Sequence, residues 1–445
     1  MKCIEDEIPF DLPDGWEWER LGNVSIIARG GSPRPIDKFI TDDEDGVNWI
    51  KIGDTEKDGK YIRQTKEKIK SEGLSKTRYV KSGDFLLTNS MSFGRPYILK
   101  TDGCIHDGWL VIGNIETVFN QDFLYYALSS GFMFTTLSLL AAGSTVKNLK
   151  TDTVRSVMFP IPPMDAQMRI AKHLEDLINI VDTINSNKKE LAQIIGIVKA
   201  KILDLAIHGK LVPQNPNDEP ASVLLERIRE EKEELIKQGK IKRDKKEFVI
   251  FKGDDNSYYQ DLPENWIKIR LSSISEIITK GTTPRGGRIA YSQSGIGFLR
   301  AENIAGYDKL NLSNLNYIDE ESHNNYLKRS ILKENDILIT IAGTLGRTGI
   351  VPQQALPLNT NQAVAIIRLV DKNIINVKYL VYAINSPQIK DDLLDKSVDV
   401  AIPNLSLENI ADCNIPFPPF AEQKRIVTAI EEAFSKLDKI SESLA

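Results

Sequence analysis

The chain has 445 residues, of which 41% are hydrophobic and 27% charged. This composition is typical of a globular protein with two or three domains and excludes a largely disordered chain. No apolar run approaches the roughly 20 residues of a membrane span, and no basic region followed by an apolar stretch opens the chain. We therefore expect a cytoplasmic protein without a membrane contact. Its formal net charge of −5 means that any nucleic-acid contact must come from local basic patches.

The three cysteines, Cys3, Cys104 and Cys413, are far apart and form no CxxC pair. Neither a disulfide framework nor a zinc site is indicated, because both need several cysteines or histidines at short, regular spacing. The four histidines share no metal-ligand spacing either. We expect free thiols and no metal.

An internal repeat organises the whole sequence. Leu12-Pro13 with Trp16 recurs as Leu262-Pro263 with Trp266, at an offset of 250 residues. Further landmarks follow in the same order at a slowly drifting offset. They are GGSPR at 30–34 with GTTPR at 281–285, FGR at 93–95 with LGR at 345–347, KNL at 147–149 with PNL at 403–405, and FPIPPMDAQMRI at 159–170 with FPPFAEQKRI at 417–426. The sequence is therefore a tandem duplication.

Each copy begins with short β-rich runs separated by glycine-bearing loops, and helical stretches come late. This order predicts two pseudo-symmetric α+β domains. The predicted elements are strands at 25–28, 47–52, 84–88 and 109–112 in the first copy and helices at 122–130 and 378–385.

The proline cluster at the end of each copy is followed by a continuous helical pattern, starting near Asp165 and near Ala421. Apolar residues alternate steps of four and three, which is a heptad repeat and indicates a coiled coil. Antiparallel pairing lets both helices bury their seams, and the first helix would be roughly 65 Å long. The predicted seam comprises Ile170, Leu174, Leu177, Val181 and Ile184 in the first helix and Ile426, Ile430 and Leu437 in the second.

The sequence thus predicts five parts. They are a repeated domain over 1–164, a long coiled-coil helix over 165–208, a connector with a charged helix over 209–250, a second repeated domain over 251–420, and a shorter second helix over 421–445. Ala445 corresponds to Lys189 of the first copy, so the portion matching 190–207 has no counterpart. Full pairing of the first helix would then require another chain or a longer one.

Motifs for catalysis are missing from the sequence. A methyltransferase that uses S-adenosylmethionine would need a glycine-rich turn after a strand and, for amino methylation, an N/D-P-P-Y/F loop, and neither is present. No Gly-Lys pair is followed by Ser or Thr, which excludes a P-loop. The acidic run at 42–45 lacks the Glu-x-Lys partner of a nuclease. We expect no enzyme activity in this chain.

Local basic segments could contact phosphates. The stretch 57–81 has nine basic and three acidic residues, and 277–301 has no acidic residue until Glu302 follows it. Equivalent positions of the two copies carry cations on turns, where an arginine can bind guanine bidentately and Ser or Thr can read other base edges. The candidate DNA-binding residues are Arg34, Lys51, Arg63, Lys66, Lys68, Ser90, Ser92, Arg95 and Lys147 in the first copy and Lys280, Arg285, Arg288, Arg300, Thr344 and Arg347 in the second.

Three features together resemble the specificity subunits of type I restriction-modification systems. They are the LPxxW start of each domain, the (I/F)PxPPxxxQxRI pattern that opens each long helix, and KILDLAIHGKLVPQNPNDEPA at 201–221. The resemblance covers essentially the whole chain. It implies two target-recognition domains that each read one half of a split, asymmetric DNA site, with the helices acting as a spacer for the unread gap.

The resemblance also implies partners and cofactors. Two modification subunits would dock on the helices and bring S-adenosylmethionine, and ATP-dependent restriction subunits would translocate and cut double-stranded DNA, with Mg and ATP bound there and not in this chain. By the same analogy, Gln167, Arg169, Gln423 and Arg425 are interpreted as packing residues at the helix starts. Two other classes remain open: a standalone DNA methyltransferase or nuclease, and a coiled-coil adaptor that does not bind DNA.

Overall fold

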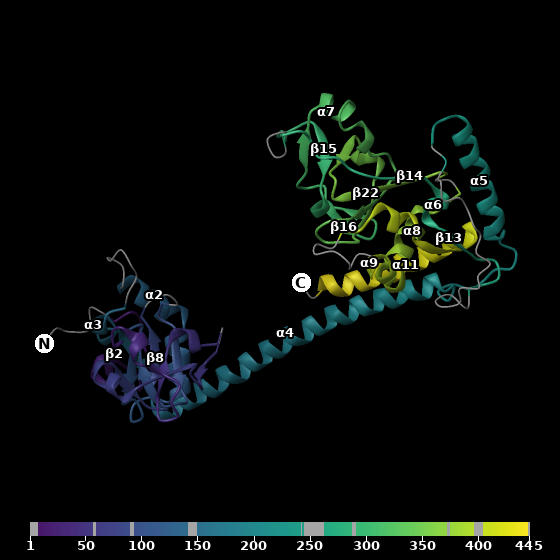
Figure 1. Cartoon of the computed structure of the whole chain (residues 1–445). Coiled ribbons are helices and arrows are strands. Elements are labelled where there is room, and N and C mark those ends of the chain that lie inside the picture. The colour runs from purple at the N-terminus through teal and green to yellow at the C-terminus, as the bar shows by residue number, and fades with distance from the viewer. Residues whose placement is uncertain are drawn as a thin grey trace. The chain divides into compact units, whose positions relative to one another are not determined.

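The computed structural model describes residues 8–56, 59–89, 93–140, 149–241, 243, 262–286, 291–371, 374–395 and 404–443. The chain divides into two units, Met1–Ser186 and Asn187–Ala445 (Figure 1). Each unit has its own hydrophobic cores. The boundary between the units lies inside one helix of 44 residues, α4 (Met164–Ile207).

Two five-stranded sheets form the first unit, in the orders β3-β6-β4-β10-β7 and β2-β11-β8-β9-β5. A separate antiparallel pair, β1 with β12, joins the start of the unit to the residues that lead into α4. The strands are β1 (Glu17–Arg20), β2 (Ile26–Arg29), β3 (Ile40–Thr41), β4 (Val47–Ile50), β5 (Tyr61–Ile62), β6 (Glu67–Ile69), β7 (Arg78–Val80), β8 (Phe85–Thr88), β9 (Pro96–Leu99), β10 (Gly103–Ile105), β11 (Trp109–Gly113) and β12 (Met158–Ile161). The helices are α1 (Gln121–Ser129), α2 (Gly131–Leu140) and α3 (Thr151–Arg155).

The central strands of the second of these sheets are apolar on both faces because they separate two cores. Successive side chains of a strand point to opposite faces. In β8, Phe85 and Leu87 pack with α1, α2 and α3, whereas Leu86 faces the core shared with β4 and β10. The strands predicted at 84–88 and 109–112 therefore become strands buried on both sides.

The second unit repeats this plan with a smaller sheet system. Its sheets have the orders β14-β22-β19-β20, β18-β15-β21 and β16-β17, and β13 pairs with β23 as β1 pairs with β12. The strands are β13 (Ile267–Arg270), β14 (Ser275–Lys280), β15 (Ile296–Leu299), β16 (Ile304–Gly306), β17 (Lys309–Leu310), β18 (Asn316–Ile318), β19 (Ile337–Thr340), β20 (Thr348–Ile350), β21 (Leu358–Thr360), β22 (Val364–Leu369) and β23 (Asn414–Phe417). The helices are α5 (Ala221–Lys237), α6 (Leu271–Ile274), α7 (Glu320–Asn324), α8 (Val377–Ile384), α9 (Pro387–Asp395), α10 (Leu407–Ala411) and α11 (Phe420–Ser443).

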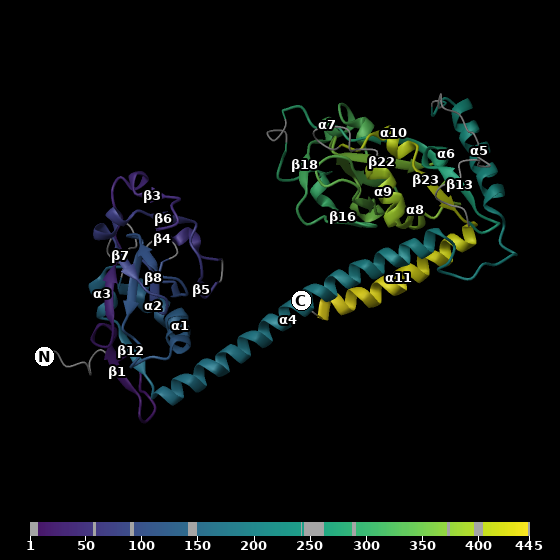
Figure 2. The same cartoon turned by 60° about the horizontal axis from the view of Figure 1, so that its bottom comes forward.

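The last part of α4 and helix α11 lie side by side in the second unit and run antiparallel (Figure 2). Lys199 forms an ion pair with Asp438, whereas Gln214, which follows α4, lies beside Glu422 near the start of α11. The predicted antiparallel pairing of the two long helices is thus confirmed.

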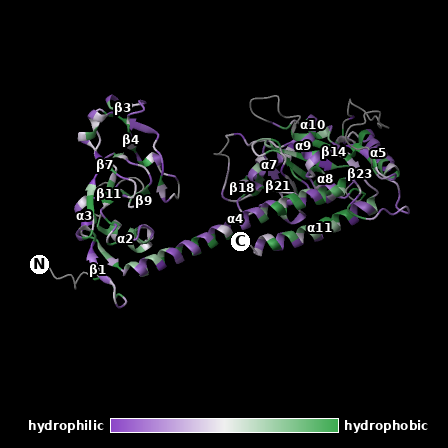
Figure 3. Ribbon diagram, turned by 90° about the horizontal axis from the view of Figure 1, so that it is seen from below, coloured by the Kyte–Doolittle hydropathy of each residue, from purple (hydrophilic) through white to green (hydrophobic). Residues whose placement is uncertain are grey.

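The burial of the predicted seam differs along the helices. Ile426 and Ile430 are fully buried in the core of the second unit, and Leu437 is half-buried. Ile170 and Leu174 are half-buried near the start of α4. By contrast, Leu177, Val181 and Ile184 are 46%, 54% and 58% exposed. Apolar residues recur among polar ones along this part of α4 (Figure 3).

One buried glutamine fastens the start of each long helix to its domain. Gln167 accepts a hydrogen bond from the backbone N of Asn120 at 2.8 Å and donates to the carbonyls of Val118 and Pro162 at 2.8 and 2.9 Å. Gln423 repeats the arrangement with Asn376 N and Pro418 O, both at 2.9 Å. These contacts confirm the interpretation of the two glutamines as packing residues.

Among the described residues, no single helix combines the length and apolar character needed to cross a membrane, although α1 and α2, bent by 63°, meet those criteria as a pair. Phe123, Leu124 and Leu128 of α1 are buried in the first unit's core.

Substituting Gln423 with Leu removes both hydrogen bonds at nearly constant volume. It leaves the Asn376 N–H and the Pro418 carbonyl buried without a partner, so we expect the second unit to lose about 2–4 kcal/mol of stability. Urea unfolding followed by circular dichroism measures this loss. The exposed Gln354 provides the control substitution Gln354→Ala, and equal stability of the two variants would contradict the role given to Gln423.

Candidate nucleic-acid interface

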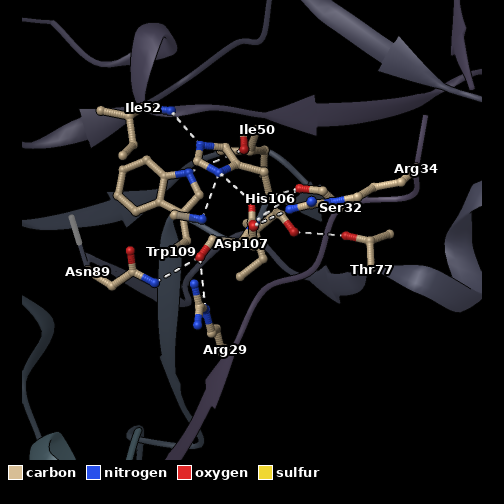
Figure 4. Close-up of polar contacts among 12 residues, drawn as sticks. Arg29, Ser32, Arg34, Ile50, Ile52, Thr77, Asn89, His106, Asp107 and Trp109 are labelled. Carbon is tan, nitrogen blue, oxygen red and sulfur yellow. Dashed lines mark hydrogen bonds and ion pairs between the residues drawn. The ribbon is translucent and has the colours of Figure 1, made fainter. Parts of the chain in front are cut away.

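The turn that follows β2 packs its backbone against the turn that follows β10. Gly30 N donates to Trp109 O at 3.0 Å, and Gly31 N donates to Ile105 O at 3.2 Å. A Cβ atom at Gly30 would lie 2.2 Å from the carbonyl oxygen of His106, so only glycine allows this approach. The turn therefore places Ser32 and Arg34 beside residues 106–109 (Figure 4).

Two further segments join at the same point. Asn89, at the end of β8, donates its backbone N–H to Gly108 O at 3.0 Å and accepts from Leu149 N at 3.0 Å. Four stretches that are distant in sequence thus converge. We call them the Gly30 corner, which comprises residues 30–34, Asn89, residues 106–109 and Leu149.

The second unit builds the same corner from the matching landmarks. Gly281 N donates to Val364 O at 3.0 Å, Ile341 N to Ala363 O at 2.8 Å, and Leu405 N to Ile341 O at 3.1 Å. A Cβ at Gly281 would lie 2.1 Å from Asn361 O. We call residues 281–285, Ile341, residues 361–364 and Leu405 the Gly281 corner.

The two corners share a backbone but differ in their side chains. At equivalent positions the Gly30 and Gly281 corners have Ser32 and Thr283, Asn89 and Ile341, His106 and Asn361, Asp107 and Gln362, and Trp109 and Val364. The arginines at the fifth position of each glycine turn, Arg34 and Arg285, are the exception. Of the candidates predicted from the sequence, the structure therefore places Arg34 and Arg285 at equivalent positions of a repeated backbone frame whose other side chains differ.

Asp107 is fixed by hydrogen bonds to both its backbone and its side chain. Its carbonyl oxygen accepts from Arg29 Nε at 3.0 Å and from Asn89 Nδ2 at 2.8 Å. Ser32 Oγ donates to Asp107 Oδ1 at 2.9 Å, and Arg34 Nη2 lies 3.5 Å from Oδ2. The carboxylate is 42% exposed and the Arg34 side chain 82% exposed, so both are open to a ligand.

Although burial alone would raise it, the pKa of Asp107 is lowered, chiefly by the hydrogen bond from Ser32, then by a backbone hydrogen bond, with a smaller contribution from the charge of Arg29. The residue therefore remains ionised at neutral pH and presents a charged acceptor within a corner that carries Arg34 and that Arg29 contacts from outside.

His106 is held neutral by its surroundings. Ile52 N lies 3.2 Å from its Nε2 and Gly108 N lies 2.7 Å from its Nδ1, so both ring nitrogens face backbone N–H groups. A neutral imidazole has one acceptor nitrogen and can accept one of these N–H groups, whereas an imidazolium has no lone pair and can accept neither. Burial lowers the pKa of His106, and this effect outweighs the neighbouring carboxylate of Asp107. Protonation would therefore disturb the turn that carries Asp107.

The hairpin loop beside each corner is closed by a threonine. Thr88 Oγ1 accepts from Arg95 N at 2.9 Å, and Thr340 Oγ1 accepts from Arg347 N at 2.9 Å. Gly94 and Gly346 have φ of 73° and 74°, which favours glycine at both turns. Arg95 lies over the ring of Tyr97, whereas Arg347 and the candidate Thr344 are exposed.

Two arginines at and beside the Gly281 corner contact an aromatic ring and a hydroxyl group, whereas Arg34 of the Gly30 corner contacts a carboxylate. The Arg285 guanidinium lies 4.6 Å from the centroid of the Tyr326 ring, and Arg329 Nη2 donates to Thr282 Oγ1 at 3.1 Å. Arg285 remains exposed. Stacking on an aromatic face leaves the edge of a guanidinium free to donate hydrogen bonds.

The other candidates lie outside the corners. Lys51 and Arg300 occupy equivalent positions after β4 and β15, where each pairs with an acidic side chain, Glu67 and Glu302. Arg63, Lys66 and Lys68 belong to the stretch from β5 to β6. There Arg63 lies over Tyr61, Lys66 donates to Gly53 O and Lys68 donates to Glu44 O. Lys280 is exposed at the end of β14, and Ser90, Ser92, Lys147 and Arg288 lie outside the described residues.

Sequence reasoning missed Arg29, Asn89, His106 and Asp107. The signal for the last two was the match between HDGW at 106–109 and NQAV at 361–364, which follow equivalent strands. No group of three or more potential metal ligands among His, Cys, Asp and Glu occurs in the part of the chain that the structure describes.

Comparison with known proteins identifies the family. The model of the type I restriction modification DNA specificity domain matches residues 13–193 and again residues 263–444. The chain belongs to this family. The two matches correspond to the two copies of the repeat, and each contains one of the corners described above.

Relatives extend over almost the whole chain. The EcoAI specificity subunit of Escherichia coli is 26% identical, with 98% of this chain and 80% of the relative covered, and the EcoBI specificity subunit of the same species is 27% identical, with 98% and 82% covered. Two solved structures share the fold. They are the HsdS subunit of Thermoanaerobacter tengcongensis (TM-score 0.56, 18% identity, 98% and 93% covered) and a chain from a study of complex assembly and conformational transition in a type I R-M system (TM-score 0.61, 17% identity, 98% and 94% covered).

The substitution His106→Asn tests the pH sensitivity of the Gly30 corner of this family member. Asn361 in the second unit accepts from Ala363 N through Oδ1, so asparagine should preserve the turn. Because the folded-state pKa of His106 lies below its ordinary value of 6.5, the folded state binds fewer protons, and stability falls as pH drops below that value.

We expect wild type to lose more stability between pH 7.5 and pH 5.5 than His106→Asn does. Tryptophan fluorescence during urea unfolding suits this measurement because four of the five tryptophans lie in the first unit. Identical pH dependence of the two proteins would show that His106 does not contribute.

Proposed function

We propose that the chain is the non-catalytic DNA-specificity subunit of a type I restriction-modification complex. Its two domains would each read one half of a split, asymmetric site in double-stranded DNA, and its long helices would serve as the spacer and as the docking site of the modification subunits. We expect it to act in the cytoplasm, where that DNA is accessible.

The repeated corner is the observation that carries this proposal. A shared backbone with different side chains is what two readers of different half-sites need, because the frame fixes position and the side chains select bases. Arg34 and Arg285, at the same step from each glycine turn, and Arg95 and Arg347, on matching hairpins, are the cations best placed for phosphates or guanine edges.

The exposed apolar residues of helix α4 favour the docking of modification subunits on it. Every residue from 175 to 190 is exposed in this chain, including the apolar Leu177, Ile178, Ile180, Val181 and Ile184. A contiguous apolar stripe on a helix usually marks an interface. We propose that helices of two modification subunits cover it. Those subunits would bind S-adenosylmethionine, and restriction subunits would bind ATP and Mg.

Mapping of methylated adenines tests the function as a whole. The chain is co-expressed with the modification subunit of its host, and single-molecule sequencing locates the modified bases across the genome. We expect one split motif with a fixed gap, because two readers on a fixed spacer can only accept two half-sites at one separation.

Three other results, from this mapping or from the purified chain, would contradict the proposal. A continuous motif would contradict the two-reader mechanism. Methylation by the purified chain alone would favour a standalone methyltransferase. If the affinity of the chain for DNA does not fall as the salt concentration rises, an adaptor is favoured. Phosphate contacts release counterions and would make that affinity salt-dependent.

The docking surface is tested by the double substitution Val181→Asp with Ile184→Asp. Two charges on the apolar stripe should abolish co-purification with the modification subunit, because each carboxylate would have to be buried without a partner. Thr183→Asp, on an exposed position of the same helix segment, is the matched control and should leave the complex intact. A complex that survives the double substitution would refute this docking site, provided that circular dichroism finds the helix content of both variants unchanged.

A further inference from the structure

An acidic side chain stands at the centre of the Gly30 corner, between two arginines. Asp107 Oδ1 is taken by the Ser32 hydroxyl at 2.9 Å, whereas Oδ2 has, among the residues that the structure describes, the longer contact to Arg34 at 3.5 Å. The hydrogen bond from Ser32 therefore orients the carboxylate (Figure 4), and the side chain is 42% exposed, so its second oxygen can accept from a stronger donor. The backbone carbonyl of the residue is clamped from two sides, by Arg29 and Asn89.

A carboxylate is an unusual group to hold rigidly on a DNA-reading surface. Phosphates repel it, so it can only be accommodated where it faces base edges. In the major groove, cytosine N4 and adenine N6 offer exocyclic amino donors, whereas guanine O6 and thymine O4 are acceptors. A fixed carboxylate thus accepts from amino-bearing bases and is repelled by guanine and thymine at the same position, which is selection against wrong bases as much as for right ones.

The second unit provides an internal comparison. Gln362 occupies the position of Asp107 on an equivalent turn and is exposed. Its amide can both donate and accept, so it lacks the one-sided preference of a carboxylate. The backbone ladder around both residues is the same, as the bonds from Gly30 and Gly281 and from Asn89 and Ile341 show. The two positions thus share a backbone frame and carry side chains of different chemistry.

From this geometry we infer that Asp107 is a specificity-determining residue of the first domain, whose free carboxylate oxygen accepts a hydrogen bond from the exocyclic amino group of one cytosine or adenine in the half-site. Ser32 is a positioning residue that fixes the carboxylate, and Arg34 balances its charge. Gln362 holds the corresponding position in the second domain, where its amide can both donate and accept. The inference rests on the proposed DNA-reading function.

Selection of bound sequences tests it without relying on methylation activity. The complex of the full chain with its modification subunit is incubated with a pool of DNA in which both half-sites are randomised, and retained DNA is sequenced. For Asp107→Asn we expect the preference at one base pair of the first half-site to fall from at least about tenfold to about twofold. The second half-site and the gap should be unchanged, and affinity for random DNA should not fall.

The reciprocal substitution Gln362→Asp protects the test against a folding defect in the first corner, because Gln362 is exposed and has an acidic counterpart on the same backbone. It should create a preference for cytosine or adenine at one position of the second half-site and leave the first half-site as in wild type. Ser32→Ala should weaken the same position as Asp107→Asn, because it frees the carboxylate to rotate.

Three results would overturn the inference. Asp107→Asn and Gln362→Asp could both leave the selected motifs as in wild type, in which case neither position reads a base. Asp107→Asn could lower affinity for all sequences equally, which is the signature of a purely structural role. A wild-type complex that selects no split motif would instead remove the proposed function, and the inference with it.

Discussion

Each long helix is attached to its domain through one buried glutamine, and much else in the fold depends on that attachment. Gln167 and Gln423 are 1% and 0% exposed, and each ties a helix start to the backbone N–H of an asparagine, Asn120 or Asn376. Those asparagines cap α1 and α8 with their own side chains. A glutamine amide satisfies the carbonyl before the helix and the cap of a neighbouring helix at once, which no apolar residue can do. The direction in which a helix leaves its domain is thereby set by hydrogen bonds that are costly to break in a dry environment.

In each domain the buried strands and the side chains of the corner are under different structural constraints. Strands β8 and β11, and their counterparts β19 and β22, are buried on both faces and tolerate little change. The corners lie at the ends of these strands, where backbone bonds from Gly30 and Gly281 maintain the frame irrespective of the side chains. Because a main-chain ladder does not depend on residue type, the side chains of the turn are free to differ. The pairs Asp107 with Gln362 and His106 with Asn361 are the outcome, and the asparagine reproduces the acceptor role of the histidine.

Local periodicity and the repeat made the framework predictable. The helix expected from 165 extends from Met164 to Ile207. It was predictable because the two prolines before it and its heptad pattern are local features of the sequence. The corners were only partly predictable, since Arg34 and Arg285 could be matched by their turns, whereas the partners of Arg34 lie more than 70 residues away. The number of basic residues in a segment did not predict which of them are packed against other side chains. Lys60 belongs to the basic stretch, yet its side chain is 16% exposed, pairs with Asp122 at 2.5 Å and lies over Tyr126. Sequence charge does not distinguish such a structural cation from one that faces a ligand.

The pairing of basic side chains with carboxylates also affects how strongly the chain could bind DNA. Of the repeated cations, Lys51 and Arg300 are paired with carboxylates, and the chain as a whole is acidic. Cations that are already neutralised release no counterions from DNA, so they add little to phosphate-driven affinity. Few exposed arginines remain in the corners. Under the proposed function, the corners would therefore contribute mainly discrimination between sequences, because the Asp107 carboxylate repels phosphates. A reader of this kind would discriminate well between sequences, because weak contacts to the DNA backbone do not compensate for a wrong base.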